Sequence, residues 1–78
     1  MATQTIQVRG CEFPNAGEAL QEWYADPGWD HVILIGGKHI CVDREEADRL
    51  TTSGVRFAFV HDQEMPDGSY RTMTIPVN

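Results

Sequence analysis

The sequence lacks the features that mark several large classes of protein. It has no run of roughly 18 apolar residues that could cross a membrane, and no basic segment followed by an apolar run that would indicate a secretory signal. Its two cysteines, Cys11 and Cys41, allow at most one disulfide. Without a signal peptide we expect a cytoplasmic protein with reduced thiols, and a Cys11–Cys41 disulfide is the alternative.

Basic residues are also scarce. Six Lys and Arg stand against twelve Asp and Glu, which gives a net charge of −6. Nucleic acid is therefore not an expected partner, because that affinity comes largely from Lys and Arg neutralising phosphates. The acids are spread along the chain, which is typical of a charge that serves solubility. A nucleic-acid mimic that blocks a basic partner is the alternative, but the sequence has no dense acidic segment.

Motifs of known chemistry are missing. The sequence has no C-x-x-C and no H-x₃-H spacing. Gly36-Gly37-Lys38 resembles part of a phosphate loop, but no Ser or Thr follows the lysine and a strand, not a helix, is expected next. Asp43 and Glu46 look like paired carboxylates, yet their spacing is better explained by the start of a helix. The sequence thus indicates no cofactor and gives no evidence for catalysis.

What is present is the pattern of one small α+β domain over residues 1–78. Apolar residues make up 41% of the chain, which is ordinary for a globular protein. Alternation and turn residues predict strands at 5–9, 31–35, 38–42, 55–61 and 70–77, with a turn-rich connection at 10–14. Helices are expected to follow Asn15 and Asp43, since each could cap a helix and has a glutamate three residues later.

The resulting order, β-α-β-β-α-β-β, predicts a two-layer fold. Its first six elements match the ferredoxin-like split βαβ arrangement, with an extra C-terminal edge strand where Pro76 stands. The alternative is an antiparallel meander over 30–77 with the helices on one face. In both arrangements one face of the sheet has no helix to cover it.

The hairpin around Gly36-Gly37 makes that face unusual. A two-residue turn pairs Ile35 with Lys38 and Leu34 with His39, so alternation separates two sets of side chains. The set expected on the open face, together with its neighbours from strand 55–61, is Val32, Leu34, His39, Cys41, Ala58 and Val60. Because most of these are apolar, we expect an interface there, with a second copy of the chain or another protein as the partner. The alternative is that the C-terminal strand or the loop with Met65 folds over them.

His39 and Cys41 support a different hypothesis. They lie two residues apart on one strand and could supply half of a zinc site or a reactive thiol beside a histidine. A closed zinc site needs two more ligands, and the candidates are His31, His61, Asp62 and Cys11. Trp29 follows a Pro-Gly turn and is a possible binding residue, although a packing role is the simpler interpretation.

Overall fold

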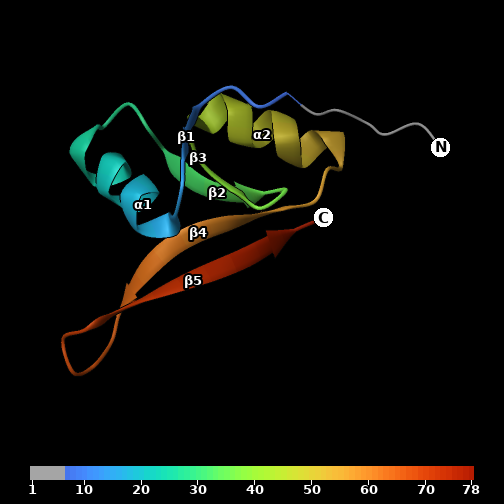
Figure 1. The fold of residues 1–78 in the computed structure, drawn as a ribbon. Coiled ribbons are helices and arrows are strands. Elements are labelled where there is room, and N and C mark those ends of the chain that lie inside the picture. Colours follow the sequence, from blue (N-terminus) through green and yellow to red (C-terminus); the bar gives the residue numbers. More distant parts are fainter. Residues whose placement is uncertain (1–6) are drawn as a thin grey trace.

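The computed structural model describes residues 7–78 and shows an α+β protein with a five-stranded sheet and two helices (Figure 1). The elements in chain order are β1 (Cys11–Phe13), α1 (Ala16–Ala25), β2 (His31–Ile35), β3 (Lys38–Val42), α2 (Arg44–Ser53), β4 (Phe57–Glu64) and β5 (Tyr70–Val77). This is the predicted alternation of strands and helices.

Both helices begin where the sequence predicts. The Asn15 side chain accepts from the Glu18 N–H at 2.9 Å, and the Asp43 side chain accepts from the Glu46 N–H at 2.8 Å. Each cap satisfies an amide that has no partner inside its helix. α2 ends at Gly54, whose φ of 79° is the left-handed conformation that favours glycine there.

The β2–β3 hairpin also has the predicted register. Gly36 and Gly37 have φ values of 56° and 79°, as a tight primed turn requires. Ile35 pairs with Lys38 and Leu34 pairs with His39, and the ladder continues to His31 and Val42. Successive residues of both strands therefore point to alternate faces of the sheet.

The strand order differs from the prediction. The sheet runs β1-β3-β2-β4-β5, and every described pair is antiparallel. In the ferredoxin-like arrangement β4 would lie beside β1, whereas here β4 lies on the other side, beside β2. The meander is not found either, because β2 separates β3 from β4. The local pattern of each strand is the same in all three arrangements, so it could not select among them.

This order explains why the fold has three layers and not two. The connections β1–α1–β2 and β3–α2–β4 each pass over one strand and step in the same direction across the sheet. Their first strands, β1 and β3, run in opposite directions. Because β–α–β crossovers are right-handed, the two helices are placed on opposite faces.

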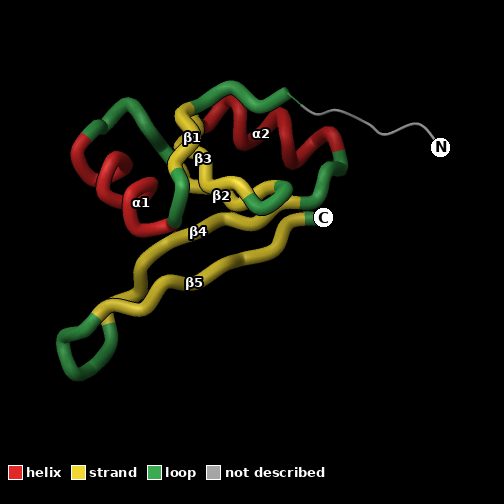
Figure 2. Tube along the Cα trace, in the orientation of Figure 1, coloured by secondary structure: helices red, strands yellow, loops and turns green. Residues whose placement is uncertain are grey.

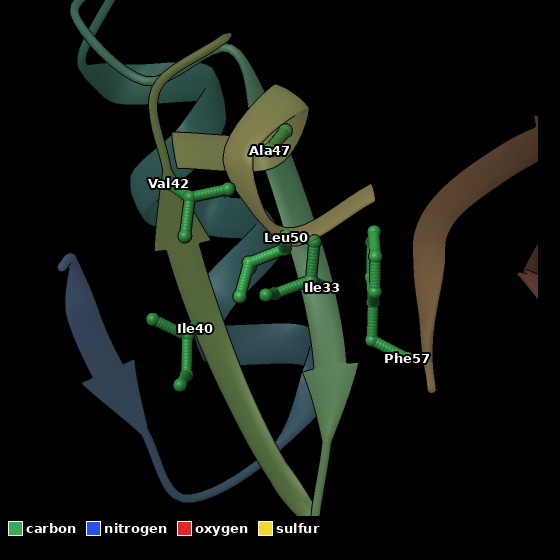
Figure 3. Packing of buried hydrophobic residues seen from close by; sticks show 6 residues of the cluster. All are labelled: Ile33, Ile40, Val42, Ala47, Leu50 and Phe57. Atoms are coloured by element: carbon green, nitrogen blue, oxygen red, sulfur yellow. The ribbon is translucent and has the colours of Figure 1, made fainter. Parts of the chain in front are cut away.

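Each helix buries one face of the sheet. The α1-side core consists of Ala19, Leu20, Val32, Cys41 and Val60. The α2-side core consists of Ile33, Ile40, Val42, Ala47, Leu50 and Phe57, and Figure 3 shows Leu50 of α2 beside Ile33 of β2. The alternation along β2 and β3 therefore supplies apolar residues to two cores at once.

The chain before β1 is not the predicted strand. Thr5 and Ile6 lie outside the described residues, and residues 7–9 form no strand. Their backbone is bound by side chains of α2 instead: the Arg9 N–H donates to Glu46, and the Gln7 carbonyl accepts from Arg49. The strand β1 falls within the segment expected to be a turn-rich connection. Gly10 just before it passes so close to β3 that a Cβ would stand 2.2 Å from the Cys41 carbonyl oxygen.

The β4–β5 hairpin projects beyond the helices (Figure 2). β4 pairs with β2 only through Ala58, Phe59 and Val60, whereas it pairs with β5 along its whole length from Phe57 to Glu64. The part of the hairpin beyond Val60 therefore has no third strand. β5 forms one edge of the sheet.

Candidate functional site

The helix α1 covers half of the six residues that were predicted to lie on an open face of the sheet. Val32, Cys41 and Val60 have exposed fractions of only 2%, 0% and 4%, because Ala19 and Leu20 pack on them. The expectation of an uncovered face was wrong for these three residues. It assumed that both helices share one face, and the strand order places them on opposite faces.

The other three predicted interface residues lie nearer the Gly36-Gly37 turn. Leu34 pairs with both His39 and Ala58, and all three are half-buried. The Nδ1 atom of His39 is buried and has no hydrogen-bond partner among the described residues. These side chains form a small row across β3, β2 and β4, much smaller than the predicted patch.

The environment of Cys41 disfavours thiol chemistry. Its Sγ donates a hydrogen bond to the Ala19 carbonyl oxygen at 3.2 Å, inside the α1-side core. Burial, with a smaller contribution from nearby Glu22, raises the pKa of the Cys41 thiol to about 11. Since the thiolate is the nucleophile and the metal ligand, this protonated thiol is suited to neither role.

The described residues contain no metal-binding cluster. Among residues 7–78, no group of three or more His, Cys, Asp and Glu side chains could hold an ion. Cys11 lies opposite Cys41 in the β1–β3 ladder, and both are free thiols, Cys11 exposed and Cys41 buried. His39 and Cys41 share a face as predicted, but further ligands do not join them.

Trp29 is half-buried and packs against the α1-side core, as Trp23 does. The backbone N–H of Trp29 donates to the Asp26 carbonyl in the turn after α1, and the Trp23 indole N–H donates to the Asp30 carbonyl at 3.1 Å. These two hydrogen bonds fix the path of the chain from α1 into β2.

A cleft of about 270 Å³ lies where β2 begins beside β4. His31, His61 and Phe59 line it with Ile75 and Trp23, and the His31 and Phe59 rings lie 4.9 Å apart. The cleft is mainly apolar and opens toward β5. It extends the apolar surface of the hairpin and brings no set of catalytic groups together.

The most exposed apolar surface lies on β5. Four large hydrophobic residues are exposed in the described part of the chain, and three of them belong to this strand: Tyr70 at 64%, Met73 at 36% and Ile75 at 49%. Only one charged residue, Arg71, lies within β5. The sequence pattern predicted β5 as a strand at an edge of the sheet. It did not predict that the exposed apolar side chains would lie on this strand.

The direction of the backbone groups of β5 follows from the hairpin turn. The Met65 N–H donates to the Ser69 carbonyl at 2.7 Å, so the backbone of Ser69 points toward β4. Backbone groups alternate along a paired strand. The register Glu64–Tyr70 to Phe57–Val77 has no interruption. It follows that Arg71, Met73, Ile75 and Val77 bond to β4.

The remaining residues of β5 point their backbone groups away from the sheet. We call these outward-facing N–H and C=O groups the β5 edge, which comprises Tyr70, Thr72, Thr74 and Pro76. Pro76 has no N–H and is found in sheets at such outward positions, in agreement with this assignment. Within residues 7–78 no strand pairs with this edge.

The other edges of the sheet are protected. β1 has only three residues, and Glu12 on it forms an ion pair with Lys38 at 3.6 Å. On the projecting part of β4, the backbone that faces away from β5 belongs to Asp62 and Glu64, both acidic. Short strands and charges are the usual means of preventing edge pairing. The β5 edge is long and carries few such devices.

Neither helix among residues 7–78 has the length and apolar character needed to cross a membrane. Comparisons with protein-family models, with curated proteins and with solved structures find no match to this chain.

Proposed function

We propose that this protein acts by association, and that it binds its partner through β5 by accepting an extended strand. One observation carries the proposal: the β5 edge has free backbone donors and acceptors beside three exposed large apolar side chains, Tyr70, Met73 and Ile75. Strand addition uses both features, since the backbone groups give affinity and alternate side chains give specificity. The predicted mode of action is kept, and its surface moves from the face under α1 to β5.

The flanking structure supports this role. β4 pairs with β5 along eight residues and holds it in an extended conformation, so a partner strand meets a formed template. Phe59 and Ile75, which pair across β4 and β5, offer an apolar surface next to the edge. A strand added at β5 would cover Ile75 and Met73 on one face and Tyr70 on the other.

A cytoplasmic location is part of the proposal. Cys11 and Cys41 face each other across β1 and β3 as thiols, which fits a reducing compartment. No charge pattern or cofactor site suggests a partner other than a protein.

Selection of peptides from a random ten-residue library on the immobilised protein tests strand addition without knowledge of the partner. We expect binders that shift the NMR signals of Tyr70, Thr72 and Thr74 more than those of α1 or α2. Thr74→Pro removes one outward N–H and should weaken binding about five-fold, while the matched Thr74→Val keeps that N–H and should bind as the wild type does. Binders that map to another surface, or that bind Thr74→Pro equally well, would contradict the proposal.

A further inference from the structure

We infer that the strand added at β5 comes from a second copy of this chain, paired antiparallel about a two-fold axis at Met73. The inference rests on the proposed function, since it names the partner for the same edge. It would join two five-stranded sheets into one continuous sheet. The axis lies perpendicular to the sheet, so each face of one copy continues into the same face of the other.

The sequence of β5, YRTMTIPV, is self-complementary about Met73. In an antiparallel pair related by a two-fold axis, residues equally far from the axis on either side stand opposite each other. Thr72 of one copy then lies opposite Thr74 of the other, and Tyr70 opposite Pro76. Thr–Thr cross-strand pairs are favourable.

The outward backbone groups agree with this register. Tyr70, Thr72, Thr74 and Pro76 are the residues that can bond across the new junction, and the axis at Met73 pairs them only with one another. Thr72 and Thr74 then exchange both of their hydrogen bonds with the partner's Thr74 and Thr72. The Tyr70 N–H of one copy donates to the Pro76 carbonyl of the other. Pro76 has no N–H to donate in return, and this one missing hydrogen bond lies at the end of the ladder.

Other positions of the two-fold axis along β5 would pair fewer of these outward-facing groups and side chains. An axis at Thr74 would place Tyr70 opposite Asn78, beyond the end of β5, and leave its largely exposed ring without a partner on the ladder. An axis between two residues would set outward-facing groups opposite inward-facing ones, which cannot bond.

The exposed side chains favour a second copy over an unlike strand. On the α2 side of the sheet, Met73 meets the partner's Met73, and Ile75 lies against the stem of the partner's Arg71. Arg71 is the only charged residue on the strand, so the junction brings no acid against acid although the chain carries a net charge of −6. A two-fold pair also closes the assembly, because both β5 edges are used and, among the described residues, the edges that remain are the short β1 and the acidic end of β4.

Sedimentation equilibrium tests the identity of the partner. We expect a mass approaching twice the 8.8 kDa of the chain at high micromolar concentration. Thr74→Pro should weaken self-association about 30-fold, since the symmetric interface loses two hydrogen bonds at once. Thr74→Val keeps both bonds and should still dimerise. Circular dichroism checks that Thr74→Pro is folded, and if it is not, Met73→Glu serves as the second variant.

Cysteine cross-linking tests the register. In a Cys11→Ser background, Met73→Cys should form a disulfide-linked dimer under mild oxidation, because the two Cα atoms at the axis would be about 4.5–5.5 Å apart. Ile75→Cys is the matched control and should cross-link poorly, since each residue faces Arg71 of the other copy. Cross-linking that is fastest at Thr74→Cys would overturn the axis at Met73.

Strand addition at β5 and the identity of the added strand are contradicted by different results. A chain that stays monomeric at high micromolar concentration but binds selected peptides along β5 would overturn the second-copy inference and leave strand addition intact. A monomeric chain whose peptides bind elsewhere would overturn both.

Discussion

Glu46 is the polar residue in the buried set of the described chain, with an exposed fraction of 1%. Its carboxylate accepts from the Arg9 N–H at 2.7 Å and from two nitrogens of Arg49 at 2.7 and 2.6 Å. Arg49 in turn donates to the Gln7 carbonyl. The sequence pattern predicted that Glu46 belongs to a capping box. The Glu46 side chain instead binds the Arg9 N–H and Arg49, and so holds residues 7–9 against α2.

Replacing this carboxylate should destabilise the fold. We expect Glu46→Gln to lower the free energy of unfolding by about 2 kcal/mol, because charged hydrogen bonds to Arg49 are lost while Arg49 itself remains half-exposed and hydrated. Urea unfolding followed by circular dichroism measures the change. The matched Glu45→Gln alters an exposed residue of the same turn and should change stability by less than about 0.5 kcal/mol. Equal effects for the two variants would contradict the role given to Glu46.

The same contacts predict a pH dependence. Hydrogen bonds from Arg49 lower the pKa of Glu46 from 4.5 to about 2, and the Arg9 N–H adds to this effect. A carboxyl whose pKa is lowered by folding stabilises the folded state above its unfolded pKa, and this stabilisation is lost as the pH falls toward the folded pKa. The stability difference between wild type and Glu46→Gln should therefore be constant above about pH 5 and shrink between pH 4.5 and 2. A difference that does not vary over that range would argue against an ionised Glu46.

The two cysteines should differ sharply in reactivity. Cys11 is exposed, whereas Cys41 is fully buried and its pKa is raised to about 11. Because alkylation requires an accessible thiolate, iodoacetamide at pH 8 should modify Cys11 in the native protein and leave Cys41 unmodified. Mass spectrometry of tryptic peptides measures both sites, and urea-unfolded protein is the control in which both should react. Rapid native labelling of Cys41 would restore the thiol-dependent hypothesis.

At the scale of elements, local signals and long-range arrangement were predictable to different degrees. Asn15, Asp43 and Gly36-Gly37 act through neighbours within a few residues, so helix starts and the hairpin register could be read from the sequence. The position of β4 depends on whether it pairs with β1, β3 or β2, and the alternation along each strand is the same in all three cases. The error at Val32, Cys41 and Val60 follows from that single choice.

The β5 surface was missed for a related reason. The sequence marks residues 70–77 as a strand and Pro76 as an edge signal, but exposure depends on what packs above the strand. Because α1 and α2 cover β2 and β3, the hairpin of β4 and β5 is left partly uncovered. The exposure of β5 can therefore be predicted only when the positions of both helices are known.

Val32, which the sequence predicted to be on an open face, is buried beneath α1. We expect Val32→Glu to destabilise the protein by about 3 kcal/mol or more, since it buries a carboxylate without a partner beneath Leu20. Met73→Glu, on the exposed strand, should change stability by less than about 1 kcal/mol but weaken association. Thermal unfolding and sedimentation distinguish the two effects. A Val32→Glu protein that is stable and merely monomeric would contradict the position of α1.

For the whole molecule, the edges of the sheet account for the proposed behaviour. β1 is short and bears an ion pair, the projecting part of β4 is acidic, and β5 has an unprotected ladder of backbone groups. A small domain with one such edge either aggregates or closes that edge with a partner. The proposed two-fold pairing about Met73 would close it and leave both cores intact.

Amide hydrogen exchange along β5, followed by NMR at several protein concentrations, tests this account most directly. Arg71, Met73 and Ile75 bond to β4, so their amides should be protected at every concentration. The amides of Tyr70, Thr72 and Thr74 should exchange quickly in dilute solution and become protected as the concentration rises into the range where the dimer forms. Fast exchange of these three amides at all concentrations, in a protein that sediments as a monomer, would contradict pairing of β5 with a second copy.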